Sequence, residues 1–227
     1  LFENAVGLDA DQVDGQGVQV MRLAWIRARG FARQRHYLLG EWSLEQQIAD
    51  QGGAAQVAAR AGRADAAPDP SPTDLAHLRR TFVLAEDARR VGGAPYGALV
   101  ADASGNVVAE HGDTSSIDGG DPADHAEMVT VRAAWRVLGD DGMKAATLYA
   151  STEPCTMCSG AAYWTGIGRV VYGLSVARLL EFTGDTPDHA SFALPSREVL
   201  THGARPVTVV GPLLEDEAAQ AHRGYWR

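Results

Sequence analysis

Apolar residues along the last two thirds of the chain change repeatedly between a helical and an extended period, which predicts an order of helices and strands. Residues 74–91 place apolar positions at helical spacing up to a Gly-Gly pair, and they predict an amphipathic helix. The runs 96–101 and 107–110 are short and apolar, and the Gly105-Asn106 pair between them suits a tight hairpin.

After this hairpin the pattern alternates between strand and helix. A helix is expected at residues 121–138, with Asp121 as its cap, Pro122 at its first position and Gly139 at its end. We also expect strands at 147–150, 169–172 and 206–210, and helices at 154–166, 176–181 and 214–221. This order predicts an α/β fold in which a mixed five-stranded sheet is covered by helices on both faces.

The first third of the chain has a different composition. Residues 18–42 show apolar positions at helical spacing, interrupted by Gly30, and Ser43 opens another short helix. Residues 63–73 gather Ala, Asp and three prolines, as a linker does. We therefore expect residues 1–72 to form a helical N-terminal extension with an Ala/Pro-rich linker, and residues 73–227 to form the main domain.

Charge limits the classes of partner. The net charge of -9 argues against a broad phosphate-binding surface. One strip is basic throughout, and we interpret it as a solvated helix face, with contact to nucleic acid as the alternative: Arg22, Arg27, Arg29, Arg33 and Arg35. No apolar run is long enough to span a bilayer and no secretory signal is visible, so we expect a cytoplasmic protein without membrane contact.

The two cysteines, Cys155 and Cys158, are the only ones in the chain. In a chain without secretory features, two cysteines argue against a disulfide framework and favour a metal site or a redox pair. Both lie at a predicted helix start, as does His125. One imidazole and two thiolates form the ligand set of a catalytic zinc, whose fourth position stays open for water.

Glu127 is the candidate catalytic residue, because a carboxylate near such a site can move a proton from water to substrate. His-X-Glu alone is a weak signal, and Cys-X-X-Cys alone fits a redox pair or a structural zinc as well. Together, however, His125-Ala126-Glu127 and Pro154-Cys155-Thr156-Met157-Cys158 form the zinc deaminase signature.

These residues resemble the cytidine deaminase-like superfamily, and most closely its branch of bacterial guanine deaminases and nucleoside deaminases. The resemblance covers about residues 75–226 and includes Pro95-Tyr96-Gly97-Ala98 and Gly160-Ala161-Ala162-Tyr163-Trp164. It implies a three-layer α/β/α sandwich, zinc on His125, Cys155 and Cys158, proton transfer by Glu127, and a homodimer. Residues 1–70 resemble no family that we can name.

The same resemblance suggests residues for substrate binding. Trp164 matches the guanine deaminase form of its helix, and Tyr96 and Trp226 could stack on a base. Guanine deaminases carry an Asn at the end of the second strand, where this chain has Thr114 beside Asp113, so guanine itself is in doubt. An acidic residue of the family matches Asp188, or else Asp185, and residues 222–226 could form an aromatic lid.

Three functions remain open at this point. The favoured one is a hydrolytic deaminase of a purine-like base or nucleoside, of guanine or guanosine type. The alternative is a deaminase of adenosine or cytosine in RNA or single-stranded DNA, similar to tRNA adenosine deaminases. The third is a non-catalytic binding module that keeps zinc as a structural staple.

Overall fold

The computed structural model describes residues 69–184 and 192–226. A five-stranded sheet has the strand order β2-β1-β3-β4-β5. The strands are β1 (Gly97–Ala101), β2 (Val107–Gly112), β3 (Thr147–Thr152), β4 (Arg169–Leu174) and β5 (Thr208–Val210). The hairpin pair and β1 with β3 are antiparallel, whereas β3, β4 and β5 run parallel. The predicted mixed sheet is confirmed.

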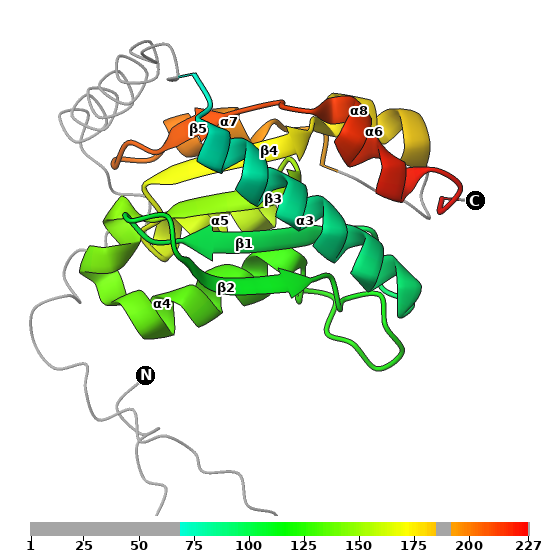
Figure 1. The fold of residues 1–227 in the computed structure, drawn as a ribbon, viewed down its shortest axis with the longest axis horizontal. Helices are drawn as coiled ribbons and strands as arrows, with labels where there is room; N and C mark the ends of the chain where they lie inside the picture. The colour runs from blue at the N-terminus through cyan, green and yellow to red at the C-terminus, as the bar shows by residue number, and fades with distance from the viewer. Residues whose placement is uncertain (1–68, 185–191, 227) are drawn as a thin grey trace, which may run out of the picture. The chain divides into compact units, whose positions relative to one another are not determined.

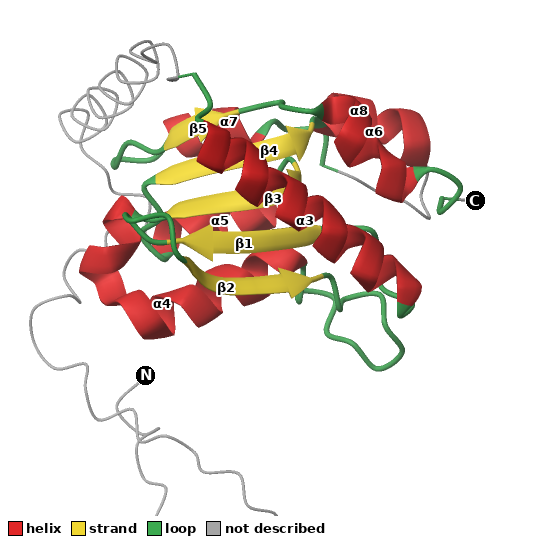
Figure 2. Ribbon diagram, in the orientation of Figure 1, coloured by secondary structure: helices red, strands yellow, loops and turns green. Residues whose placement is uncertain are grey.

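Helices cover both faces of this sheet (Figures 1 and 2). Helix α3 (Pro72–Arg90) crosses one face, and α4 (Ala126–Ala145) and α5 (Thr156–Trp164) cover the other. The remaining helices are α6 (Val176–Thr183), α7 (Ser196–Thr201), α8 (Glu215–Ala218) and the 3-10 helix η1 (Ala219–His222). The three-layer α/β/α sandwich is thus confirmed.

Alternating side chains of the strands fill two cores, as the two-residue period of a strand requires. On one face Ala98, Val100, Leu148 and Val170 pack with Val131 of α4. On the other face the alternate positions, Leu99, Ala101, Tyr149, Val171 and Val210, form a second cluster. The parallel strands are buried on both faces, which explains their continuous apolar runs.

Helix α3 is capped at its start and packs closely on β1 near its middle. Its N-cap Ser71 forms a capping box with Asp74, and the helix starts two residues before the predicted first residue. A Cβ on Gly97 would lie 2.3 Å from the backbone oxygen of Thr81, so only glycine lets β1 approach α3 this closely.

Helix α4 differs from the prediction at its start. It starts at Ala126 with His125 as N-cap, because residues 121–124 form a turn in which Asp121 Oδ1 accepts from the Ala123 amide. The prediction of Asp121 as cap and Pro122 as first helical residue was therefore wrong. Gly139 has a non-helical backbone, with φ 61° and ψ -178°, and it separates two helical segments within α4. The first segment therefore ends where the sequence predicted, and a second segment follows it.

Helix α7 was not predicted, and the strand at its exit begins at Thr208 instead of Pro206. Among the described residues no helix is long and apolar enough to cross a membrane. The N-terminal extension and the arginine strip lie outside the described residues, so their predictions stay predictions.

Candidate active site

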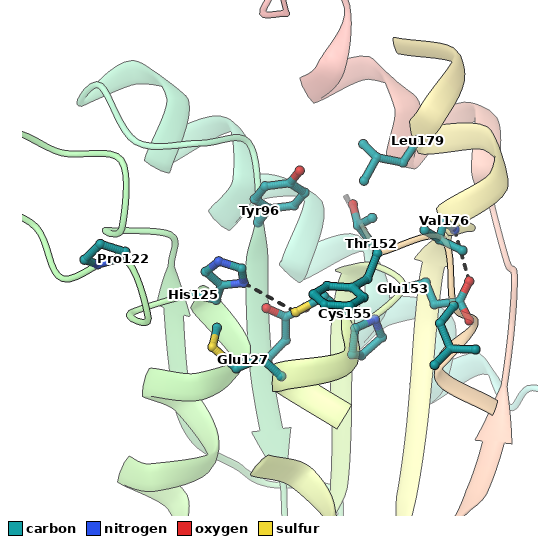
Figure 3. Close-up of a pocket in the computed structure, with 13 residues that line it drawn as sticks. Tyr96, Pro122, His125, Glu127, Thr152, Glu153, Cys155, Val176 and Leu179 are labelled. Atoms are coloured by element: carbon teal, nitrogen blue, oxygen red, sulfur yellow. Dashed lines mark hydrogen bonds between the residues drawn. The ribbon is translucent and has the colours of Figure 1, made fainter. Parts of the chain in front are cut away.

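His125 and Glu127 lie at the start of α4. His125 is the N-cap residue and has an extended backbone, and its side chain forms no capping hydrogen bond with the helix. Glu127 is the second residue of the first turn and is 6% exposed. The two side chains therefore reach the same space from one helix end, although they are only two residues apart (Figure 3).

The cysteines are positioned in the same way, by an N-cap residue and a first-turn residue of α5. Cys155 is the N-cap residue with an extended backbone, and Cys158 lies in the first turn, fully buried. Both helices direct backbone N–H groups and positive partial charge towards these side chains, which favours an anionic ligand set.

The three donor atoms have the spacing of a zinc site. His125 Nδ1 lies 3.7 Å from Cys155 Sγ and 3.6 Å from Cys158 Sγ. Tetrahedral coordination at the usual Zn–N and Zn–S lengths separates such donors by about 3.6 Å. All three atoms lie within 4.8 Å of one another, and among the described residues theirs is the one such group of potential ligands. The donor set therefore fits zinc.

Interactions among the three donor side chains shift their pKa values. A hydrogen bond from Cys158 lowers the pKa of the Cys155 thiol to about 4, with His125 contributing further. The same pairing with Cys155 raises the pKa of Cys158, and that of His125 to about 9. Metal binding at this site therefore releases protons, from the Cys158 thiol and the His125 imidazolium, because both must be deprotonated to act as ligands.

Burial raises the pKa of Glu127 above that of an exposed glutamate. Desolvation raises the pKa of Glu127 to about 7, and the negative charge of Cys155 adds to this rise. Asp113, buried at the end of β2, contributes in the same direction. A carboxyl group with a pKa near neutrality can both accept and return a proton.

A cavity of about 330 Å³ opens over this group of residues. Figure 3 shows Tyr96, His125, Glu127 and Cys155 around it, with α6 on the opposite side. Its other described lining residues are mostly apolar and include no Lys or Arg. They are Pro122, Thr152, Glu153, Pro154, Met157, Val176, Leu179, Phe192 and Leu194.

The structure brings some of the predicted substrate residues to this cavity and leaves others away from it. Tyr96 lines it, with a pKa raised by burial, so its phenol stays neutral. Thr114 is exposed and is not a lining residue; the buried side chain at this strand end is Asp113. Trp164 is 85% exposed at the far end of α5, outside the lining.

The C-terminal aromatic segment packs on its own domain instead of forming a cavity wall. Trp226 stacks on His222 at 6.0 Å between ring centroids and contacts the ring of Tyr96 at 6.1 Å. It is not among the lining residues. Asp185 and Asp188 lie outside the described residues.

Two lining residues were not singled out from the sequence, although they directly precede Pro154. Thr152 ends β3, and its hydroxyl lies 3.1 Å from His222 Nε2. Glu153 accepts hydrogen bonds from the backbone and hydroxyl of Ser196 and from the Val176 amide. Their position beside the cysteine motif was the available signal.

Comparison with known proteins gives the family. Residues 71–174 match the cytidine and deoxycytidylate deaminase zinc-binding region. A probable cytosine deaminase of Schizosaccharomyces pombe is 38% identical over 156 residues, which are 69% of this chain and 94% of the relative. A guanine deaminase of Bacillus subtilis is 38% identical over 96 residues, or 42% of this chain and 60% of the relative.

The fold agrees with this result. The solved structure of a guanine deaminase from Nitrosomonas europaea aligns with a TM-score of 0.55 at 24% identity, covering 74% of this chain and 90% of that one. The matched family region contains both metal-ligand motifs, and the Schizosaccharomyces pombe relative aligns over almost its whole length. The chain therefore belongs to the family of zinc-dependent deaminases that is named for cytidine and deoxycytidylate deaminases.

Proposed function

We propose that this protein hydrolytically deaminates a free nucleobase, with His125, Cys155 and Cys158 as zinc ligands and Glu127 as the proton shuttle. The observation that carries the proposal is the position of Glu127. Its carboxylate lies buried beside the donor atoms, 3.7 Å from Cys158 Sγ, and it lines the cavity where a ring would bind.

The reaction exchanges an exocyclic amine for oxygen. Water adds to the ring carbon that carries the amine, the C–N bond breaks, and ammonia leaves. Zinc, when bound, acidifies water and supplies the charge that this attack needs. Glu127 takes one proton from the water and gives it to a ring nitrogen, and then takes the remaining hydroxyl proton of the adduct and gives it to the departing amine. Tyr96 and the apolar walls orient the ring and exclude bulk water.

The cavity supports a small neutral substrate. Its volume of about 330 Å³ is at the lower end for ligand pockets. No Lys or Arg lines it among the described residues, and the chain carries a net charge of -9. A nucleotide or a nucleic acid needs cationic contacts to its phosphates, so these features favour a free base over a deaminase of RNA or DNA.

Cytosine is the first substrate to test, because the Schizosaccharomyces pombe relative with that predicted substrate aligns over 94% of its length. The purine expectation from the sequence remains the second candidate, since the Bacillus subtilis guanine deaminase also matches at 38% identity. The experiment measures ammonia release by the zinc-loaded protein from cytosine, guanine, their nucleosides, and single-stranded RNA and DNA.

We expect turnover of at least one free base, with slower or no turnover of the nucleosides and polymers. Preferred turnover of RNA or DNA, with binding that weakens as salt rises, contradicts the proposal and supports the nucleic-acid alternative. A zinc-loaded, folded protein that releases no ammonia from any of these substrates supports the non-catalytic module.

We further propose that the protein is a homodimer that buries Trp164. This side chain is 85% exposed at the end of α5, and Met157 on the same helix is 38% exposed. Trp and Met are enriched in protein–protein interfaces relative to the rest of the surface, which supports this face of α5 as the contact.

Light scattering of Trp164→Ser is expected to give half the mass of the wild-type protein. The matched control is Val91→Ser, 70% exposed where α3 ends on the other face of the sheet, and it should keep the wild-type mass. A monomeric wild-type protein, or a Trp164→Ser variant of unchanged mass, contradicts this assembly.

A further inference from the structure

The C-terminal segment contacts the cavity through a chain of three side chains. His222 is 1% exposed, and its Nε2 lies 3.1 Å from Thr152 Oγ1. On the other side of the ring, the Trp226 indole N–H donates to His222 Nδ1 at 3.2 Å. The two rings are nearly parallel, with 11° between their planes.

These contacts fix the tautomer of His222. The indole nitrogen of Trp can only donate, so Nδ1 of His222 must be the acceptor. Burial lowers the pKa of His222 to about 4, and the charge of Arg89 acts in the same direction, so the ring is neutral near pH 7. A neutral imidazole carries one proton, and His222 therefore holds it on Nε2.

Thr152 is consequently an acceptor towards His222. Its hydroxyl oxygen accepts a hydrogen bond from Nε2–H, so its own O–H can donate to another partner. Thr152 is the last residue of β3 and lines the cavity. In the described part of the chain, its hydroxyl has no second hydrogen-bond partner.

The walls of the cavity hold this arrangement in place. The ring of Tyr96, itself a lining residue, contacts the rings of His222 at 5.4 Å and of Trp226 at 6.1 Å between centroids. Phe182 of α6 packs on His222 at 6.1 Å. The C-terminal segment thus lies directly behind the wall to which Thr152 belongs.

We propose that Thr152 is a specificity-determining residue whose hydroxyl donates a hydrogen bond to an acceptor atom of the substrate ring, and that His222 and Trp226 are positioning residues that orient this donor. The proposal rests on the proposed function and narrows its substrate class. The ring should carry a carbonyl oxygen or an unprotonated nitrogen facing Thr152, since an apolar edge would leave the hydroxyl proton without a partner.

Two matched pairs of bases test this inference. Cytosine and 4-aminopyrimidine share the amine and the ring but differ in the O2 carbonyl, and guanine and 2-aminopurine differ in the O6 carbonyl. The measured quantity is the ratio of kcat/KM for the carbonyl member to that for its partner. A purely structural defect would lower both values together and leave this ratio unchanged.

We expect Thr152→Val to reduce this ratio about three- to tenfold in one of the pairs, the range that a neutral hydrogen bond is worth. Thr152→Ser should restore it. Trp226→Phe keeps a stacked aromatic ring but removes the donor to Nδ1 of His222. The proton of His222 can then move to Nδ1, and Thr152 can donate to Nε2 instead of to the substrate. This variant should therefore also lower the ratio.

The control is Thr81→Val, a buried threonine of α3 whose hydroxyl donates to the Leu78 carbonyl, and it should leave the ratio unchanged. Zinc content and thermal unfolding establish that each variant is folded. An unchanged ratio in Thr152→Val, or no recovery in Thr152→Ser, overturns the proposal.

If the wild-type protein turns over neither pair, the proposed function fails, and the same ratio is then measured as dissociation constants by calorimetry on the zinc-loaded protein. A loss of preference in Thr152→Val still supports the role of Thr152 as a donor in that case. Absence of binding of all four bases overturns both proposals.

Discussion

Two glutamates lie within two residues of proposed zinc ligands, and their hydrogen bonds separate their roles. Glu153 uses both oxygens, accepting from Ser196 and from the Val176 amide, so its carboxylate is held in one place. In the part of the chain that the structure describes, the Glu127 carboxylate accepts from Cys158 Sγ at 3.7 Å and from its own backbone amide, and it bridges no other elements. Glu127 is therefore free to exchange a proton, whereas Glu153 ties the starts of α6 and α7 to the cysteine loop.

Two neighbouring residues after β2 differ in burial, and this difference decides which side chain lies near the site. Asp113 is 1% exposed, and its carboxylate accepts hydrogen bonds from the backbone and hydroxyl of Ser115. The adjacent Thr114 is exposed. Counting residues back from a motif cannot distinguish these neighbours, because successive side chains of an extended backbone point to opposite sides.

At the scale of elements, the N-terminus of α3 is tied to the sheet by one buried carboxylate. Asp74 is 4% exposed, and its carboxylate accepts hydrogen bonds from Nη1 and Nη2 of Arg169, at 2.6 and 3.0 Å, and from the Tyr149 hydroxyl at 2.7 Å. Burial alone would raise the pKa of Asp74. The hydrogen bonds from Arg169, Tyr149 and Ser71 outweigh this effect and hold the pKa well below its usual range.

Asp74→Asn is expected to lower the free energy of unfolding by about 3 to 5 kcal/mol, because it leaves the Arg169 charge partly buried without its partner. Urea unfolding in zinc-saturated buffer at pH 7 measures this loss. The control is Glu217→Gln, which makes the same change at the exposed pair with Arg79 and should have no measurable effect.

The pH dependence gives this prediction a second test. Since the folded pKa of Asp74 is lowered, its contribution is present above the unfolded pKa of about 4 and is lost as the pH falls further. The difference between the wild-type protein and Asp74→Asn should therefore narrow below about pH 4. Equal stabilities at pH 7 would show that the pair does not stabilise the docking of α3.

The elements also indicate how far the sequence could lead. Hydrophobic periods located all five strands, and α3 within two residues of each end, because apolar runs and a Gly-Gly pair are local signals. The start of α4 was misplaced, since Asp-Pro is a common helix opening but here forms a turn that leaves His125 as the N-cap. Helix α7 was missed because it has only six residues.

At the scale of the whole molecule, the sequence could indicate the reaction more readily than the substrate. The motifs of His125 and Cys155 lie 30 residues apart, yet each is local to one helix start, so the ligand set was visible. The cavity walls come from segments with no shared spacing, among them Tyr96, Leu179 and Phe192. The contact of His222 with Thr152 joins residues 70 positions apart, and no local pattern encodes it.

The central claim is that zinc binding and proton transfer belong to different residues of this one site. The most direct test compares the zinc-loaded wild-type protein with Glu127→Gln on the best free base of the substrate panel. Both metal content and ammonia release are measured. Cys158→Ser serves as the control that removes a proposed ligand and should lose both zinc and turnover.

Glu127→Gln is expected to retain the zinc content of the wild-type protein and to lose about 10²- to 10⁴-fold in kcat, the contribution of a well-placed general acid–base group. A variant that keeps kcat within a few-fold of the wild-type value, or that loses its zinc together with its activity, would contradict the account.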